Sequence, residues 1–268
     1  MNIIASLPIG AVSTWLLLLG APGASAQTPA ADGPKAQFPP TRSGGALVFH
    51  EKSKLPLPDG FRLLYEQTFE DESALKHFVF TDAKVWKFSA DEKSSALELV
   101  AQSKYTPKVR SPFNIALIAE KAFGDFILEA DLVQTGREYG HRDMVLVFGF
   151  KDPSKFYYAH IATAADPNAH NIFIVNDKPR TNIAKETTQG VNWGLNVWHK
   201  VRLERKLSDG SIKVYFDDLT KPIMVAEDKT FGAGHIGFGS FDDTGKVNNI
   251  KIWGASVETK KIEYFTRP

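Results

Sequence analysis

Residues 144–163 read MVLVFGFKDPSKFYYAHIAT, and this stretch decides the fold class. Its first seven residues are apolar at every position, as in a strand that is buried on both faces. The Lys-Asp-Pro-Ser run that follows is a turn by composition. Between Phe156 and Thr163 the side chains then alternate, which places Tyr158 and His160 on one face and Tyr157 on the other. We therefore expect an antiparallel hairpin buried in a β-sandwich.

Short strands of the same kind recur along the chain. The predicted strands are residues 126–133, 171–176, 198–205, 212–216, 235–241 and 247–253. In the strand 198–205 we expect Val201 and Leu203 to face the core, and Lys200, Arg202 and Glu204 to face water. The one helical turn that the sequence suggests is residues 72–77. The predicted fold class is all-β.

The two ends of the chain differ from this body. Residues 1–26 carry no charged side chain, contain a short apolar core and end in Ala-Ser-Ala, which indicates a signal peptide. Their apolar run is shorter than the roughly 20 residues of a membrane-spanning helix. We expect residues 27–45 to be a flexible tether, residues 46–258 to form one sandwich, and residues 259–268 to be a C-terminal tail. A periplasmic or secreted protein without membrane insertion is expected.

Composition narrows the classes of partner. The chain has no cysteine, so a core rather than a disulfide framework must stabilise it. Its formal net charge is +1. A nucleic-acid partner or an anionic membrane would call for a strongly basic face, so we expect neither.

Several phrases mark strand starts and turns. They are Phe69-Glu70-Asp71, Trp86-Lys87-Phe88, Phe123-Gly124-Asp125-Phe126, Trp198-His199-Lys200-Val201-Arg202 before Asp209-Gly210, and Gly234-His235-Ile236-Gly237-Phe238-Gly239. With these phrases the chain resembles the concanavalin A-like β-sandwich, or jelly roll, over residues 61–253. Within that group it is most similar to the 3-keto-disaccharide hydrolase domains and the laminin-G-like modules. The resemblance implies a carbohydrate-directed site on the concave sheet.

Two signatures of that group are altered in this chain. The keto-sugar enzymes have an Asn-Ser-Gly step and a Glu-x-Gln strand where this chain has His-Arg-Asp and Tyr-x-His. Residues 129–134 nearly reproduce the Glu-x-Asp-x-x-Glu signature of laminarinase-type retaining glycosidases, but the last position is Gln134. An amide cannot replace the carboxylic acid that such hydrolysis needs. We therefore interpret residues 129–134 as the solvated face of a strand.

The polar side chains between Gly136 and Arg180 form the candidate site. Adjacent strands lie roughly 4.8 Å apart, so side chains from consecutive strands come within reach of one another. The catalytic candidates are His160, Tyr158 and His141, and the substrate-binding candidates are Arg142, Tyr139, His170, Asn171 and Arg180. Histidine and tyrosine can move protons, and arginine and asparagine can orient a sugar. The alternative is structural: Arg142 pairs with Asp143, and the histidines cap strand ends.

Two sets of side chains suggest Ca²⁺ or another divalent metal as a cofactor. Asp242 and Asp243 lie in a Phe-Asp-Asp-Thr-Gly loop that could hold Ca²⁺. His141, Asp143 and His160 form the second set. A turn rich in Asp and Gly equally forms without a metal, so no cofactor is required.

Three functions follow from these residues. The first is an exported enzyme that cleaves a glycosidic linkage of an oligosaccharide or polysaccharide by hydrolysis or elimination. The second is a non-catalytic glycan-binding or adhesion module on the same sheet. The third is a structural envelope protein. Exposed aromatic rings, for which Tyr139, Tyr157 and Trp193 are the candidates, would stack on sugar rings in either of the first two.

Overall fold

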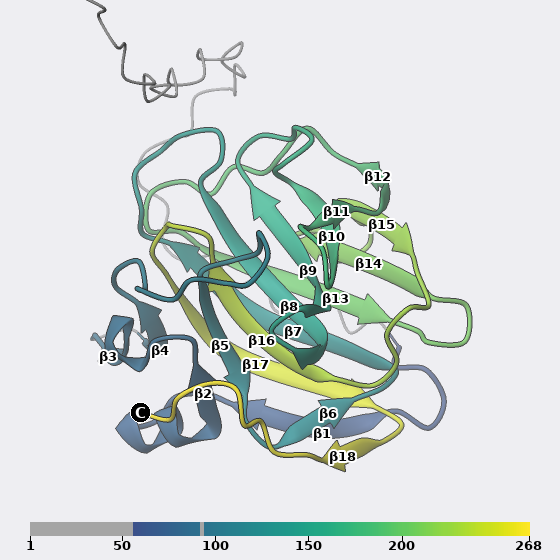
Figure 1. Ribbon diagram of the computed structural model, residues 1–268, viewed down its shortest axis with the longest axis horizontal. Helices are drawn as coiled ribbons and strands as arrows, with labels where there is room; N and C mark the ends of the chain where they lie inside the picture. Colours follow the sequence, from purple (N-terminus) through teal and green to yellow (C-terminus); the bar gives the residue numbers. More distant parts are fainter. Residues whose placement is uncertain (1–55, 92–93) are drawn as a thin grey trace, which may run out of the picture. The chain divides into compact units, whose positions relative to one another are not determined.

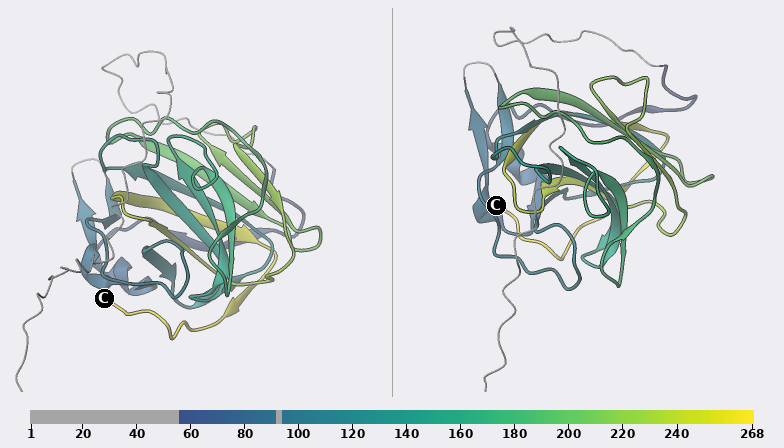
Figure 2. Two further views of the ribbon diagram at one scale, coloured as in Figure 1. Left: turned by 45° about the horizontal axis from the view of Figure 1, so that its top comes forward. Right: turned by 90° about the horizontal axis from the view of Figure 1, so that it is seen from above.

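The computed structural model describes residues 56–91 and 94–268, and within them nearly all regular structure is β-strand. Two large antiparallel sheets lie face to face as two layers (Figure 1, Figure 2). The predicted signal peptide and tether lie outside the described residues. No helix in the described part of the chain has the length and apolarity to cross a membrane.

The larger sheet has nine strands. In spatial order these are β12 (Ala184–Thr187), β15 (Met224–Glu227), β14 (Ser211–Phe216), β13 (Trp198–Arg205), β7 (Phe126–Gln134), β17 (Gly245–Gly254), β4 (Ser95–Leu99) and β3 (Trp86–Ala90), with β1 (Arg62–Gln67) also paired to β17.

The smaller sheet has seven strands. In spatial order these are β11 (Thr181–Asn182), β10 (Asn171–Asn176), β9 (Lys155–Ala162), β8 (Asp143–Asp152), β16 (His235–Ser240), β5 (Asn114–Ile118) and β2 (Phe78–Phe80). A third, two-stranded sheet pairs β18 (Val257–Thr259) with β6 (Lys121–Phe123), and the short 3₁₀ helices η1 (Glu72–His77) and η2 (Ala83–Val85) flank β2.

The predicted hairpin is strands β8 and β9. They pair antiparallel, with Val145 opposite His160 and Val147 opposite Tyr158. The register shifts beyond Phe148, where Gly149 takes a left-handed backbone with φ of 58°. Both faces of the pair are buried, as the apolar run predicts.

Strands β16 and β17 follow each other in sequence but belong to opposite sheets. Strand β16 lies between β8 and β5 in the seven-stranded sheet, whereas β17 lies between β7 and β4 in the nine-stranded sheet (Figure 1). The Asp-Asp-Thr-Gly loop between them therefore crosses from one layer to the other. This interleaving of a late segment into the middle of both sheets is a jelly-roll arrangement. The predicted all-β, concanavalin A-like sandwich is confirmed.

Two apolar clusters stabilise the sandwich. The first lies between the sheets and contains Leu128 of β7 together with Leu146 and Ile161 of the hairpin. The second covers the opposite face of the seven-stranded sheet, where Tyr158 packs with side chains from outside the sheet. Those covering residues are Val109, Phe113, Phe241, Ile262 and Phe265. The outer face of this sheet is consequently shielded from solvent along much of its length.

The predicted exposure of Arg202 is wrong, although its predicted orientation is right. Arg202 of β13 does point away from the core between the sheets, but it is only 4% exposed rather than water-facing. Its guanidinium pairs with Glu129, which lies directly opposite on β7. The carboxylate of Glu204 lies 3.6 Å away from the same guanidinium. Glu129 is thus part of an ion-pair row on a sheet face. The predicted solvated face is wrong for Gln134, which is 0% exposed.

Candidate functional site

The polar side chains predicted as a site gather where β8 begins and β9 ends. His160 and Asp143 approach each other across this hairpin through Nε2 and Oδ2, and both side chains are almost fully buried. His160 also lies 3.1 Å from the carbonyl of Asn168 through Nδ1. The two contacts together hold both ring nitrogens in place, and the one with Asn168 holds the 163–170 loop against the end of the sheet.

Asp143 belongs to a larger buried network that includes a second carboxylate. Its Oδ1 accepts a hydrogen bond from the Ser240 hydroxyl, and its backbone N–H donates to Asp243 Oδ2 over 3.0 Å. The same Asp243 oxygen accepts from the Tyr139 hydroxyl over 2.8 Å. Burial and the nearby charge of Asp143 raise the pKa of Asp243 to about 6. The network therefore holds a carboxyl group that titrates close to neutral pH.

Tyr158 lies deeper in the same face of the sheet. Its ring stacks on Phe173 with centroids 5.1 Å apart and lies 6.0 Å from that of Phe241. The side chain is fully buried, and burial raises its pKa well above the ordinary tyrosine value. Tyr158 is thus surrounded by aromatic rings and stays a neutral phenol.

Three other predicted residues are held inside the protein by hydrogen bonds. Arg142 donates to the carbonyls of Gly194 and Gln134, over 2.8 Å and 3.0 Å. His170 accepts from the Ala162 N–H and contacts Thr188, and burial lowers its pKa to about 4. Asn171 donates to the carbonyls of Asp166 and Ala169. Each of these contacts fastens a loop to the sheet.

A second group of predicted residues lies at the surface above this buried network. His141 is about half exposed and pairs with Asp166. Arg180 is half-buried and donates to the carbonyl of Asn168 over 3.0 Å. Its guanidinium also lies over the rings of Phe241 and Phe173, at 4.5 Å and 5.0 Å from their centroids. We call His141, Asp166, Asn168 and Arg180 the polar rim.

The three histidines of the candidate site do not share an open groove. His160 and His170 are 4% and 0% exposed, whereas His141 faces solvent on the rim. Tyr157 and Trp193, expected to be exposed, are also buried, at 0% and 1%. These two rings fill the core instead, and Tyr139 alone of the three aromatics is only half-buried.

The predicted metal ligands are divided between surface and interior. Asp242 is exposed, whereas Oδ2 of Asp243 accepts two hydrogen bonds from the protein. His141 turns to Asp166, while Asp143 turns to His160. Within residues 56–91 and 94–268, no group of three or more histidine, aspartate or glutamate side chains is placed to hold a metal ion.

Three residues of this region escaped the sequence analysis. Asp166 and Asn168 form a tight turn in which Asp166 accepts from the Asn168 N–H over 2.6 Å. The Asp-Pro-Asn run is the usual signal for such a turn and could have located the rim. Ser240 had no such signal, because its hydroxyl meets Asp143 from a strand 97 residues away in sequence.

Neither a family model nor a curated protein matches this chain. Among solved structures, the carbohydrate binding module CBM66 of Bacillus subtilis is 18% identical, with a TM-score of 0.46 over 69% of this chain and 96% of that one. Peanut lectin is 11% identical, with a TM-score of 0.46 over 75% and 99%. Domain 4 of AbnA, an arabinanase of Geobacillus stearothermophilus, is 10% identical, with a TM-score of 0.44 over 75% and 95%. All three likenesses are remote.

Proposed function

We propose that this protein is an exported glycan-binding module and that the polar rim contacts the sugar. The observation that carries the proposal is that some residues of the candidate site are buried and others are accessible to solvent. The groups suited to proton transfer, His160 and Tyr158, are 4% and 0% exposed, whereas His141 and Arg180 remain accessible above them. Binding needs only the accessible layer, while turnover needs the buried one.

The chemistry of the rim suits a hydroxyl-rich ligand. Arg180 supplies several N–H donors in one planar guanidinium group, which lies over the Phe241 ring at 4.5 Å from its centroid. Asn168 adds an amide and His141 an imidazole at the surface. The motif resemblance to concanavalin A-like domains supports carbohydrate as the ligand class.

A binding experiment tests the rim directly. The chain would be isolated from the periplasm, where we expect it to begin at Gln27, applied to a glycan array and titrated calorimetrically with each glycan that it retains. Arg180→Gln should weaken binding at least tenfold, equivalent to about 1.4 kcal/mol. The control is Arg267→Gln, the same change at an exposed arginine whose guanidinium pairs with Glu120. Equal affinities of the two variants, or no retained glycan, would refute the proposal.

Cleavage of a glycosidic linkage is the second candidate function. One observation favours it: the carboxyl groups of Asp143 and Asp243 share a buried network with His160, and the pKa of Asp243 is about 6. A carboxyl group with such a pKa can act as a general acid near neutral pH. Retained glycans should therefore be incubated for days, with and without chelator, and examined for shorter products. Products that disappear with His160→Ala and Tyr158→Phe would establish this function in place of binding alone.

A further inference from the structure

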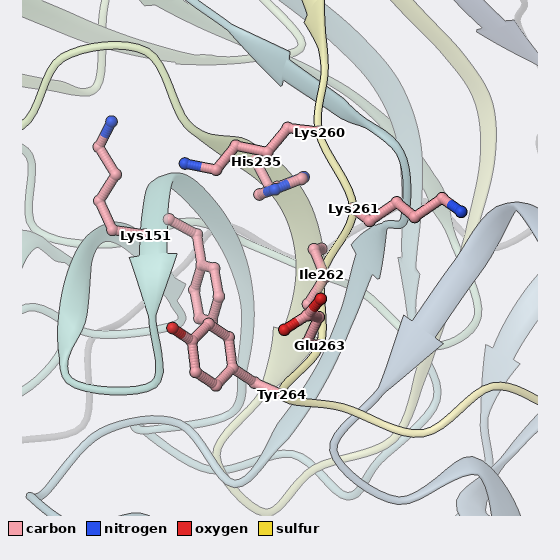
Figure 3. Close-up of a pocket in the computed structure, with 8 residues that line it drawn as sticks. Lys151, His235, Lys260, Lys261, Ile262, Glu263 and Tyr264 are labelled. Atoms are coloured by element: carbon pink, nitrogen blue, oxygen red, sulfur yellow. The ribbon is translucent and has the colours of Figure 1, made fainter.

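A hollow lies at the opposite end of strand β8 from the polar rim. It has a volume of about 220 Å³, smaller than the roughly 300 Å³ at which pockets for drug-sized ligands begin. Its lining comes from β8, from the start of β16 and from the C-terminal segment: Phe150, Lys151, His235, Lys260, Lys261, Ile262, Glu263 and Tyr264 (Figure 3). A hollow of this size suits one sugar unit.

Positive charge is concentrated on one side of this hollow. The side chains of Lys151 and Lys260 extend to the same side as the His235 ring, whereas Lys261 points the other way (Figure 3). Within the described residues, neither Lys151 nor Lys260 has a carboxylate within ion-pair distance. Lys151 Nζ instead donates to the carbonyl of Ala233.

The pKa values of Lys151 and His235 indicate that the positive charge in this hollow is not balanced by nearby negative charge. Burial lowers the pKa of Lys151, and the positive charge of Lys260 lowers it further, against a smaller opposing effect of Glu258. Burial also lowers the pKa of His235, and both lysines add to that shift. Glu263 is the carboxylate in the lining. An incoming anion would relieve the repulsion between the two ammonium groups.

The remaining lining offers an apolar surface beside the charges. Phe150 and Ile262 are 1% and 7% exposed. Tyr264 is 58% exposed, which is unusual for so large a ring in this chain. An exposed aromatic ring next to cationic donors can take the apolar face of a sugar ring while the donors hold its charged substituent.

We propose that this hollow binds an acidic sugar unit, with Lys151 and Lys260 holding its carboxylate or sulfate group and Tyr264 packing against its ring. This inference rests on the proposed function, because it assumes a glycan ligand. It adds a second contact point at the far end of β8 from the rim. The preferred ligand is then a glycan that carries oxyanions.

Calorimetric titration of the full chain distinguishes the parts of this proposal. The probes are a galacturonic acid trimer, a sulfated galactose oligosaccharide, an uncharged galactose trimer and inorganic sulfate. We expect at least one acidic oligosaccharide to bind tenfold or more tightly than the uncharged trimer and inorganic sulfate. Lys260→Gln should remove most of that preference. Lys261→Gln removes the same charge one residue away, on a side chain directed away from the cationic side, and should retain the preference.

Each other outcome overturns the proposal. The proposal is overturned if the uncharged trimer binds as tightly as the acidic oligosaccharides, or if inorganic sulfate does. It is also overturned if Lys260→Gln and Lys261→Gln lose the preference for acidic oligosaccharides equally. Failure of this site is distinguishable from failure of the rim. Arg180→Gln should weaken neutral glycans that Lys260→Gln leaves unaffected, and a glycan sensitive to Arg180→Gln alone would support the rim while excluding the second site.

Discussion

At the scale of single residues, the buried carboxylates beside the hairpin determine how this region responds to pH. Asp143 lies beside the His160 ring, whereas the hydrogen-bond donors to the Asp243 carboxylate are neutral, the Tyr139 hydroxyl and a backbone N–H. A buried carboxylate with neutral partners and a second carboxylate nearby is costly to ionise. Asp243 therefore destabilises the folded state where it is charged.

The pH dependence of stability tests this conclusion. The pKa of Asp243 is about 6 in the folded chain, above its ordinary value, so the folded state holds this proton more tightly than the unfolded state does. Its contribution to stability is complete below a pH of about 4 and is lost as the pH rises through about 6. The loss is at most about 3 kcal/mol, from a shift of roughly two units. Urea unfolding at pH 4.5 and at pH 7.5 gives the free energy of unfolding at each pH. Between the two, this free energy should fall less for Asp243→Asn than for the natural chain.

Asp242→Asn is the matched control, since Asp242 is the exposed neighbour in the same loop. It should keep most of the pH dependence of the natural chain, because the charge of Asp242 makes only the smallest of the contributions to the raised pKa of Asp243. An asparagine at position 243 still offers one oxygen to both Tyr139 and the backbone N–H, so the fold is expected to survive. If both variants showed the same pH dependence, Asp243 would not be the titrating group.

The sequence predicted which way residues point better than how deeply they are buried. Strand alternation correctly placed Tyr158 and His160 on one face, where both rings contact Phe241, because that pattern is local. Their burial depends on Phe113, Phe241 and Phe265, which come from distant parts of the chain. Arg202 shows the same limit, since its partner Glu129 lies 73 residues away and only the strand register brings the two together.

At the scale of elements, strand β16 is packed so closely that it requires glycine on one face. A Cβ atom at Gly237 would lie 2.3 Å from the carbonyl oxygen of Ala116, and one at Gly239 would lie 1.8 Å from that of Asn114. Both contacts are with backbone of the neighbouring strand β5, which cannot move aside as a flexible side chain can. The Gly-x-Gly spacing therefore permits the β16–β5 pairing.

Gly239→Ala should for this reason destabilise the fold by roughly 3 kcal/mol or more, the upper end of overpacking costs. Gly232→Ala is the control, because nothing lies within 4 Å of a Cβ atom there. Thermal unfolding followed by circular dichroism measures both. We expect a melting temperature lowered by several degrees, or no soluble protein, for the first variant and little change for the second. A similar melting temperature in both would mean that the β16–β5 contact is not rigid.

The boundaries of the strands could be predicted from the sequence better than the sheet to which each strand belongs. Residues 235–241 and 247–253 were predicted as strands, and β16 and β17 occupy nearly the same ranges. Nothing in their alternation indicates that one enters each sheet. That choice follows from hydrogen bonds with β8 and β5 in one case and with β7 and β4 in the other. A local pattern cannot report such distant partners.

At the scale of the whole described body, the second apolar cluster makes the outer face of the seven-stranded sheet an interior surface. The C-terminal segment supplies part of that cover through Ile262 and Phe265. It is fastened by backbone hydrogen bonds, two between Thr266 and Phe80 of 2.8 Å and 2.9 Å and one from Lys260 to Glu120 of 3.0 Å. The segment also lines the basic hollow. Its packing thus links the cover of the sheet to the proposed acidic-sugar site.

If the C-terminal segment is a structural cover, Ile262→Ala should cost roughly 2–5 kcal/mol, as for other buried isoleucines cut back to alanine. Ile262 is only 7% exposed, whereas Lys261 beside it is exposed, so Lys261→Ala is the control and should stay within about 0.5 kcal/mol of the natural chain. Urea unfolding gives both values. Truncation after Thr259 should add binding of a hydrophobic dye, because it uncovers Phe150 and its neighbours in the second cluster. A truncated chain that unfolds like the natural one and binds no dye would show instead that the segment is a detachable tail.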